Sequence, residues 1–151
     1  PPPPTEIYTQ VNSSAASDVY KRQSLGSMQE ALFAGRTVAV YNSLLVGKAE
    51  FLKPLLKSSI KVNSANYIAK TQVLEVELEN VSSSPLLFEN QMDYSFYSSS
   101  PVFEIPPLGN YTLRIKTLEE KEQIELKLKA IGAFTAPKES PVIRWTISVE
   151  Q

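Results

Sequence analysis

The sequence predicts a mainly β protein: a two-sheet antiparallel β-sandwich preceded by a short helix and strand and by a linker helix. Three observations lead to this prediction. After residue 58, apolar and polar residues alternate in several short runs, as is typical of half-buried strands. Clusters of Ser, Pro and Gly separate these runs at the spacing of a sandwich of about 90 residues. In residues 48–57, directly before these runs, the apolar residues have helical spacing instead.

The first 23 residues carry a proline cluster followed by small polar residues, with neither a helical nor a strand period. No face of such a segment can be buried in a core, so we expect it to be disordered. Its end, residues 14–23 (SAASDVYKRQ), resembles the translated sequencing-adapter sequence found at the ends of metagenomic reading frames. On this interpretation, residues 1–23 are non-native.

A short helix and a strand are predicted next. Ser27 and Glu30 have the spacing of a capping box, and Gly35 is well placed to end the helix in the left-handed conformation. These signals predict a helix over 27–34. Residues 37–41 (TVAVY) are β-branched and apolar and form a run short enough to be a buried strand.

The linker helix is predicted over 48–57. Its apolar positions lie on one helical face, while lysines point to water. Pro54 must lie within the first turn, or else the helix bends there. The apolar face is the candidate surface for packing between the two parts of the chain, and it consists of Phe51, Leu52, Leu55 and Leu56.

The sandwich strands follow from the alternation. The clearest runs span 73–79, 111–115, 122–130 and 142–150, and further runs occur at 59–68, 85–89, 93–97 and 102–105. Three carboxylates, those of Glu75, Glu77 and Glu79, share one face of a strand. We interpret them as a solvated face opposite Lys127 and Lys129 on a neighbouring strand, and not as a Ca²⁺ or acid/base site.

Composition excludes several classes of function. The 151 residues include 15 basic and 16 acidic side chains, a formal net charge of −1, and neither His nor Cys. Such a balance provides no field that would attract nucleic acid or anionic membrane surfaces. Without His or Cys there is no thiolate nucleophile, no Ser-His pair and no zinc site built on imidazole or thiolate. We therefore predict no catalytic residue and no metal or cofactor ligand in this chain.

An aromatic cluster is the one candidate ligand site. It consists of Tyr94, Phe96, Tyr97 and Phe103, close to a run of serines. Such a cluster could form a platform for a sugar or a peptide, although alternating aromatics on a strand more often pack in the core. Trp145, between two isoleucines of the same phase, is predicted to be a core anchor.

One stretch resembles a known family. Residues 28–42 (MQEALFAGRTVAVYN) and 44–52 (LLVGKAEFL) resemble the closing segment of the polymerase and histidinol phosphatase (PHP) metallophosphoesterases, in which a helix leads into the last strand of a metal-dependent barrel. The following residues 53–56 (KPLL) and the β-rich remainder are similar to a bacterial phosphodiesterase branch that carries an immunoglobulin-like domain after the barrel.

The resemblance, which extends over 24–149, implies a domain organisation. Residues 24–47 would be the end of a PHP barrel, 48–57 a connecting helix and 58–151 an immunoglobulin-like sandwich. The parent enzyme would hydrolyse phosphate esters with divalent metal ions held by His, Asp and Glu. None of those ligands can be assigned here, because they lie upstream of Ser24.

The predicted function is therefore that of a non-catalytic accessory domain that scaffolds its own missing PHP barrel. A homo-oligomer is a further expectation, and the family branch implies export from the cytoplasm. The alternative is a stand-alone sandwich module that binds carbohydrate or protein.

Overall fold

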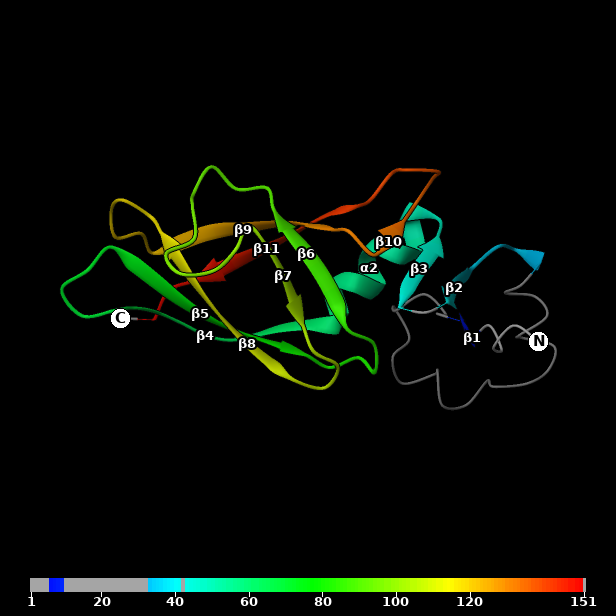
Figure 1. Cartoon of the computed structure of the whole chain (residues 1–151), viewed down its shortest axis with the longest axis horizontal. Coiled ribbons are helices and arrows are strands. Elements are labelled where there is room, and N and C mark those ends of the chain that lie inside the picture. The colour runs from blue at the N-terminus through cyan, green and yellow to red at the C-terminus, as the bar shows by residue number, and fades with distance from the viewer. Residues whose placement is uncertain (1–5, 10–32, 42, 151) are drawn as a thin grey trace.

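The computed structural model describes residues 6–9, 33–41 and 43–150 (Figure 1). Its larger part is an antiparallel β-sandwich, which confirms the predicted mainly β fold. One sheet has the order β4-β5-β8 and the other the order β11-β9-β6-β7. The first sheet consists of β4 (Ile60–Tyr67), β5 (Val73–Asn80) and β8 (Asn110–Lys116). The second consists of β6 (Leu86–Asn90), β7 (Val102–Ile105), β9 (Gln123–Ala130) and β11 (Val142–Ser148).

The alternating strand sequences explain the core between the two sheets. Along β5, Leu74, Val76 and Leu78 are completely buried, and the glutamates between them are half-buried on the outer face. The same alternation buries Leu126 and Leu128 on β9. A period of two places every second side chain on the same face, so each sheet presents an apolar inner face to the other.

The predicted strand over 93–97 is wrong. This segment is a loop that touches the edge of β8 at an isolated bridge between Phe96 and Ile115. The Asn90 side chain holds the start of the loop, since its Nδ2 donates to Tyr94 O (2.8 Å) and its Oδ1 accepts from Met92 N (2.9 Å). Local side-chain bonds of this kind compete with strand pairing.

The predicted pairing of the three glutamates with Lys127 and Lys129 is also wrong. Strand β5 lies between β4 and β8, whereas both lysines are on β9 of the opposite sheet. Glu75 instead pairs with Arg114 across β8, with Nε and Oε2 2.8 Å apart. Lys129 pairs with Glu89 at 3.5 Å. Alternation identifies the outer face of a strand, but it does not specify the neighbouring strand.

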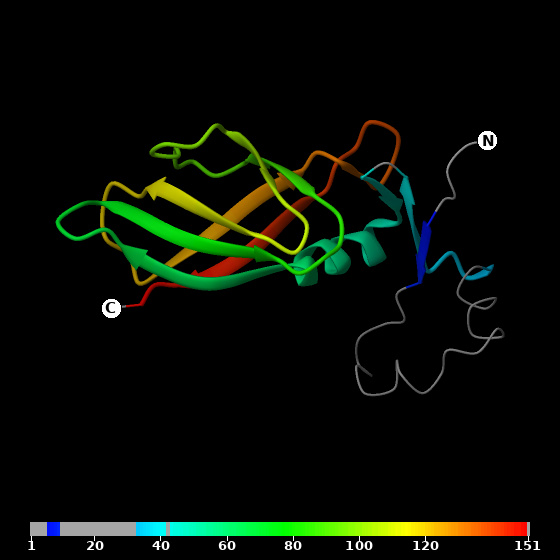
Figure 2. The ribbon, with the colours of Figure 1, turned by 60° about the horizontal axis from the view of Figure 1, so that its bottom comes forward.

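A third sheet lies at the N-terminal end of the sandwich (Figures 1 and 2), and we call it the terminal sheet. It has the order β1-β2-β3-β10, formed by β1 (Glu6–Thr9), β2 (Thr37–Tyr41), β3 (Leu44–Gly47) and β10 (Ala133–Phe134). Strand β10 pairs in parallel with β3, and the other pairs are antiparallel. Strand β10 comes from the loop between β9 and β11, so the sandwich itself supplies one strand of the terminal sheet.

Strand β2 coincides with the predicted strand, and Gly35 has the predicted left-handed conformation (φ 64°). Strands β3 and β10 are too short for an alternating pattern to be recognised. The expectation of disorder over residues 1–23 is wrong for residues 6–9, which form β1. These residues pair in register with β2, because an edge strand presents backbone groups that a further strand can bond. The rest of that segment, and most of the predicted helix over 27–34, lie outside the described residues.

Helix α2 (Ala49–Ser59) lies between the terminal sheet and the sandwich (Figure 2). Pro54 is the sixth of its residues, beyond the first turn, and its side chain is exposed to water. The helix continues directly into β4. Among the described residues, no helix is both long and apolar enough to cross a lipid bilayer.

Candidate interdomain surface

The inner face of the terminal sheet packs against α2. The strand registers align Val40, Leu45 and Ala133 in one row across β2, β3 and β10. These side chains are only 8%, 7% and 1% exposed. Helix α2 contacts both β2 and β3, so this row is covered from within the same chain.

The outer face of the terminal sheet is also apolar. The same registers align Ala39, Val46 and Phe134 in a second row, one residue out of phase with the first. Ala39 and Val46 are exposed, Val46 by 52%, and Phe134 is half-buried. Leu44, which shares the outer phase of β3, is 43% exposed. We call Ala39, Leu44, Val46 and Phe134 the outer row. It presents an apolar sheet face that the described residues leave largely open.

The four candidate packing residues of α2 divide into two pairs. Leu52 and Leu56 are completely buried, and Phe51 and Leu55 are half-buried against the core. The C-terminal end of the helix is tied to the sandwich because Trp145 Nε1 donates to Lys57 O (3.3 Å). The indole ring of Trp145 packs edge-on against Phe88, with centroids 6.1 Å apart, so this side chain is the core anchor that its sequence phase predicts.

The aromatic residues proposed as a ligand platform are not all on the surface. Phe103 is 5% exposed and stacks on Tyr111, with centroids 4.8 Å apart. Phe96 packs edge-on against Phe103 at 5.7 Å. Tyr97 is 58% exposed, and the Lys116 ammonium lies 5.4 Å from its ring centroid.

Tyr94 is half-buried beside the Lys121 ammonium, which lies 5.7 Å from its ring centroid. The neighbouring Tyr94 and Glu119 side chains raise the pKa of Lys121 above its ordinary value, with Tyr94 the larger cause. Lysine ammoniums therefore lie over the rings of both Tyr94 and Tyr97. Phe103 is buried and Phe96 is half-buried, and the two rings pack against each other within the protein.

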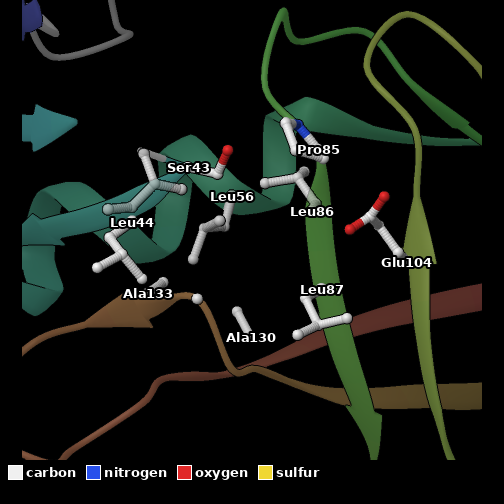
Figure 3. Close-up of a pocket in the computed structure, with 11 residues that line it drawn as sticks. Ser43, Leu44, Leu56, Pro85, Leu86, Leu87, Glu104, Ala130 and Ala133 are labelled. Atoms are coloured by element: carbon white, nitrogen blue, oxygen red, sulfur yellow. The ribbon is translucent and has the colours of Figure 1, made fainter. Parts of the chain in front are cut away.

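A hollow of about 160 Å³ opens where the terminal sheet, α2 and the β6–β7 edge of the sandwich meet (Figure 3). Its walls are mostly apolar and come from Leu44, Leu45, Leu56, Leu86, Leu87 and Ala133, among others. Two polar residues, Ser43 and Glu104, complete the lining, with Glu104 entering from β7. Leu44 belongs both to the hollow and to the outer row, so the two apolar surfaces are continuous.

The sequence predicts an interdomain surface on α2 alone, so the outer row and the hollow are not among the predicted site residues. The signal was present in part, since residues 38–40 and 44–46 are apolar at every position. A strand that is apolar at consecutive positions is typical of a sheet covered on both faces. Finding the outer row, however, requires the registers of β3 and β10. No group of three or more potential metal-ligating side chains occurs in the part of the chain that the structure describes.

Comparisons with known proteins agree with this architecture. Residues 60–146 match a family described as an Ig-like domain. Among solved structures, the chain is similar to a two-domain protein from Bacteroides vulgatus that contains a predicted PHP-like metal-dependent phosphoesterase. The TM-score is 0.68 at 22% sequence identity, and the similarity covers 85% of this chain but only 36% of that chain. No curated protein matches.

Proposed function

Because the chain belongs to the family of Ig-like domains, we propose that it is the non-catalytic accessory domain of a PHP-like phosphoesterase, docked through its terminal sheet to the metal-bearing domain. In this proposal residues 24–47, which include β2 and β3, are the end of the PHP-like barrel, so the terminal sheet joins the rest of that barrel to the sandwich. Residues 48–57 connect it to the sandwich of residues 58–151. The accessory domain covers apolar surface of the barrel and holds it in place.

The observation that supports this proposal is the open apolar outer row. Residues 38–40 on β2 and 44–46 on β3 are apolar at every position, which is typical of strands covered on both faces. In this chain α2 covers the inner face, whereas Val46 and Leu44 remain exposed on the outer face. A neighbouring domain seated on the outer row would complete the second layer and remove this apolar area from water.

The similar structure supports the identity of the neighbour. That protein has two domains, and the larger part of its chain lies outside the region similar to this one. The similarity extends beyond the sandwich, because it covers 85% of this chain while the Ig-like family match is confined to residues 60–146. Strands β2 and β3 and helix α2 precede the sandwich in sequence, on the side where a preceding domain would attach.

The chemistry would belong to the neighbouring domain. Divalent metal ions in a PHP-like parent would polarise the phosphoryl group and generate hydroxide. The described residues offer no group of ligands that fits such ions, so we place the metals in the neighbouring domain. On this proposal the apolar face of α2 packs between the terminal sheet and the sandwich and fixes the position of one relative to the other. This face consists of Phe51, Leu52, Leu55 and Leu56.

A stand-alone binding module has less support. Two of its four proposed platform residues, Phe96 and Phe103, are engaged in packing, and a lysine ammonium lies over the ring of each of the other two.

The test uses the natural gene that encodes residues 24–151. We expect the coding sequence upstream of Ser24 to contain His-x-His and Asp-x-His pairs of a metal-bearing domain. In the full-length protein, Val46→Lys should uncouple the unfolding of the two domains. Calorimetry should then resolve two unfolding transitions, where the full-length protein without the substitution has one. In the chain of residues 1–151 alone, the same change should leave the melting temperature within about 2 °C, because Val46 is already 52% exposed there.

Val102→Lys is the matched control, since Val102 is an exposed strand valine on β7, away from the terminal sheet. A different upstream domain would overturn the proposed identity of the parent. Equal effects of Val46→Lys and Val102→Lys on the full-length protein would overturn docking through the outer row.

A further inference from the structure

We propose that the hollow beside the terminal sheet is a socket for one large apolar side chain of the preceding domain, and that Glu104 at its rim pairs with a basic residue next to that side chain. This inference rests on the proposed function, because it assumes that a domain is seated on the outer row. It adds the chemistry by which the two domains recognise each other.

The size and lining of the hollow indicate an apolar occupant. Its volume of about 160 Å³ is close to that of an engineered cavity of about 150 Å³, lined by Leu, Ile and Phe, that binds benzene. Leu45, Leu56, Leu86 and Ala133 contribute apolar walls and are all at most 7% exposed. A water molecule would find few hydrogen-bond partners among these side chains, whereas a phenyl or isobutyl group would gain dispersion contacts.

The position of the hollow favours a side chain from the preceding domain over a free small molecule. Leu44 is part of the hollow and of the outer row, so a domain seated on Val46 and Ala39 lies next to the opening. Interfaces commonly have this form, with one anchoring side chain in a pocket inside a flatter apolar contact.

The charge at the rim selects the residue next to the anchor. Glu104 is exposed on β7, and its carboxylate forms no ion pair with the described residues. Leu87, its cross-strand partner on β6, lines the hollow as well. A carboxylate beside an apolar pocket favours a Lys or Arg close to the inserted side chain and disfavours an acidic one.

The experiment titrates the chain of residues 1–151 with short peptides and follows the methyl resonances of the leucines and alanines in the hollow. The probe is acetyl-Gly-Phe-Lys-Gly-amide. It should shift the methyl signals of Leu44, Leu87 and Ala133 and bind at least about tenfold more tightly than acetyl-Gly-Gly-Lys-Gly-amide, because the Phe side chain is buried. Acetyl-Gly-Phe-Glu-Gly-amide should bind roughly two- to fivefold more weakly than the probe, and 0.5 M NaCl should remove that difference.

Two variants establish where the peptide binds. Ala133→Leu fills the hollow and should weaken binding of the probe by about tenfold or more. Leu87→Phe does the same from the half-buried rim if Ala133→Leu fails to fold, which Trp145 fluorescence reports. Glu104→Gln, at an exposed position, should remove the preference for the lysine peptide while leaving the contribution of Phe intact.

The inference is overturned if the probe shifts no methyl signal of the hollow or binds the filled variant as tightly as the parent chain. The proposed pairing of Glu104 with a basic residue is overturned if the Lys and Glu peptides bind equally tightly at low salt. These outcomes are separate from those of the proposed function. A peptide that binds the hollow supports the socket even if the upstream domain is not PHP-like, and an uncoupling effect of Val46→Lys supports docking even if no peptide binds.

Discussion

Asn80 shows how one buried polar side chain organises two loops. It is completely buried at the end of β5. Its Nδ2 donates to Ser84 O (2.8 Å), Pro106 O (3.1 Å) and Ile105 O (3.3 Å). Its Oδ1 accepts from Ser82 N (2.9 Å). The amide thereby connects the loop after β5 to the turn between β7 and β8, and its loss would leave several buried backbone groups unpaired.

Replacing Asn80 with Ala should therefore lower the free energy of unfolding by about 2–4 kcal/mol, as urea denaturation would measure. Asn110→Ala is the control, because Asn110 is exposed and its side chain makes a 3.3 Å bond to Glu77. Its cost should remain within about 0.5 kcal/mol. Equal losses in the two variants would contradict the role of Asn80 in joining the loops.

At the scale of the element, α2 contains a residue that opposes its own conformation. Pro54 lies in the middle of Ala49–Ser59, where it cannot donate the hydrogen bond expected toward Glu50 O. The helix persists because Leu52 and Leu56 on its inner face are completely buried. Tertiary burial on one face thus outweighs poor helix propensity on the other.

We expect Pro54→Ala to raise the free energy of unfolding by about 1–2 kcal/mol. The relief of the proline penalty, about 3 kcal/mol in a helix interior, is offset in part by the greater freedom that alanine has in the unfolded chain. The midpoint of urea denaturation would increase correspondingly. Lys53→Ala, at the adjacent exposed position, should change the free energy of unfolding by less than about 0.5 kcal/mol. A loss of stability in Pro54→Ala would mean that the ring makes packing contacts that matter more than the missing bond.

At the scale of the whole molecule, the terminal sheet, α2 and the sandwich form a connected unit. Strand β10 belongs to the terminal sheet although it lies between two sandwich strands in sequence. Helix α2 contacts β2, β3, β4 and β11. The bond from Trp145 to Lys57 O joins the helix to the sandwich core. A neighbour that docks on the terminal sheet would therefore also stabilise the sandwich.

A chain of residues 58–151, which lacks α2 and most of the terminal sheet, should still unfold cooperatively, because the inner faces of the two sandwich sheets are retained. Its free energy of unfolding should be lower than that of residues 33–151 by several kcal/mol, about that of two buried leucines, Leu52 and Leu56. Trp145 emission should shift to the red as the covering helix is lost. An insoluble product, or one without a cooperative transition, would argue against an autonomous sandwich.

Most of the sandwich could be predicted because a strand that is buried on one face alternates apolar and polar residues in its sequence. Alternation located β5, β8, β9 and β11 within a residue or two, and the run over 102–105 coincides with β7. The loop over 93–97 was mistaken for a strand because its aromatic residues alternate like those of a strand, while the Asn90 side chain bonds that hold it leave no periodic signal. The partner of Glu75 could not be predicted because alternation carries no information on strand order.

The amino-acid order by itself determined which side chains face inward, where most of the sandwich strands run, and that the apolar face of α2 would be buried. The neighbours of each strand, the place of β10 in the terminal sheet and the alignment of Ala39, Val46 and Phe134 on one open face follow only from the folded arrangement. The reason is physical. Local periodicity reports the environment of each side chain, whereas strand order, register and the closure of a hollow depend on contacts between residues far apart in the chain.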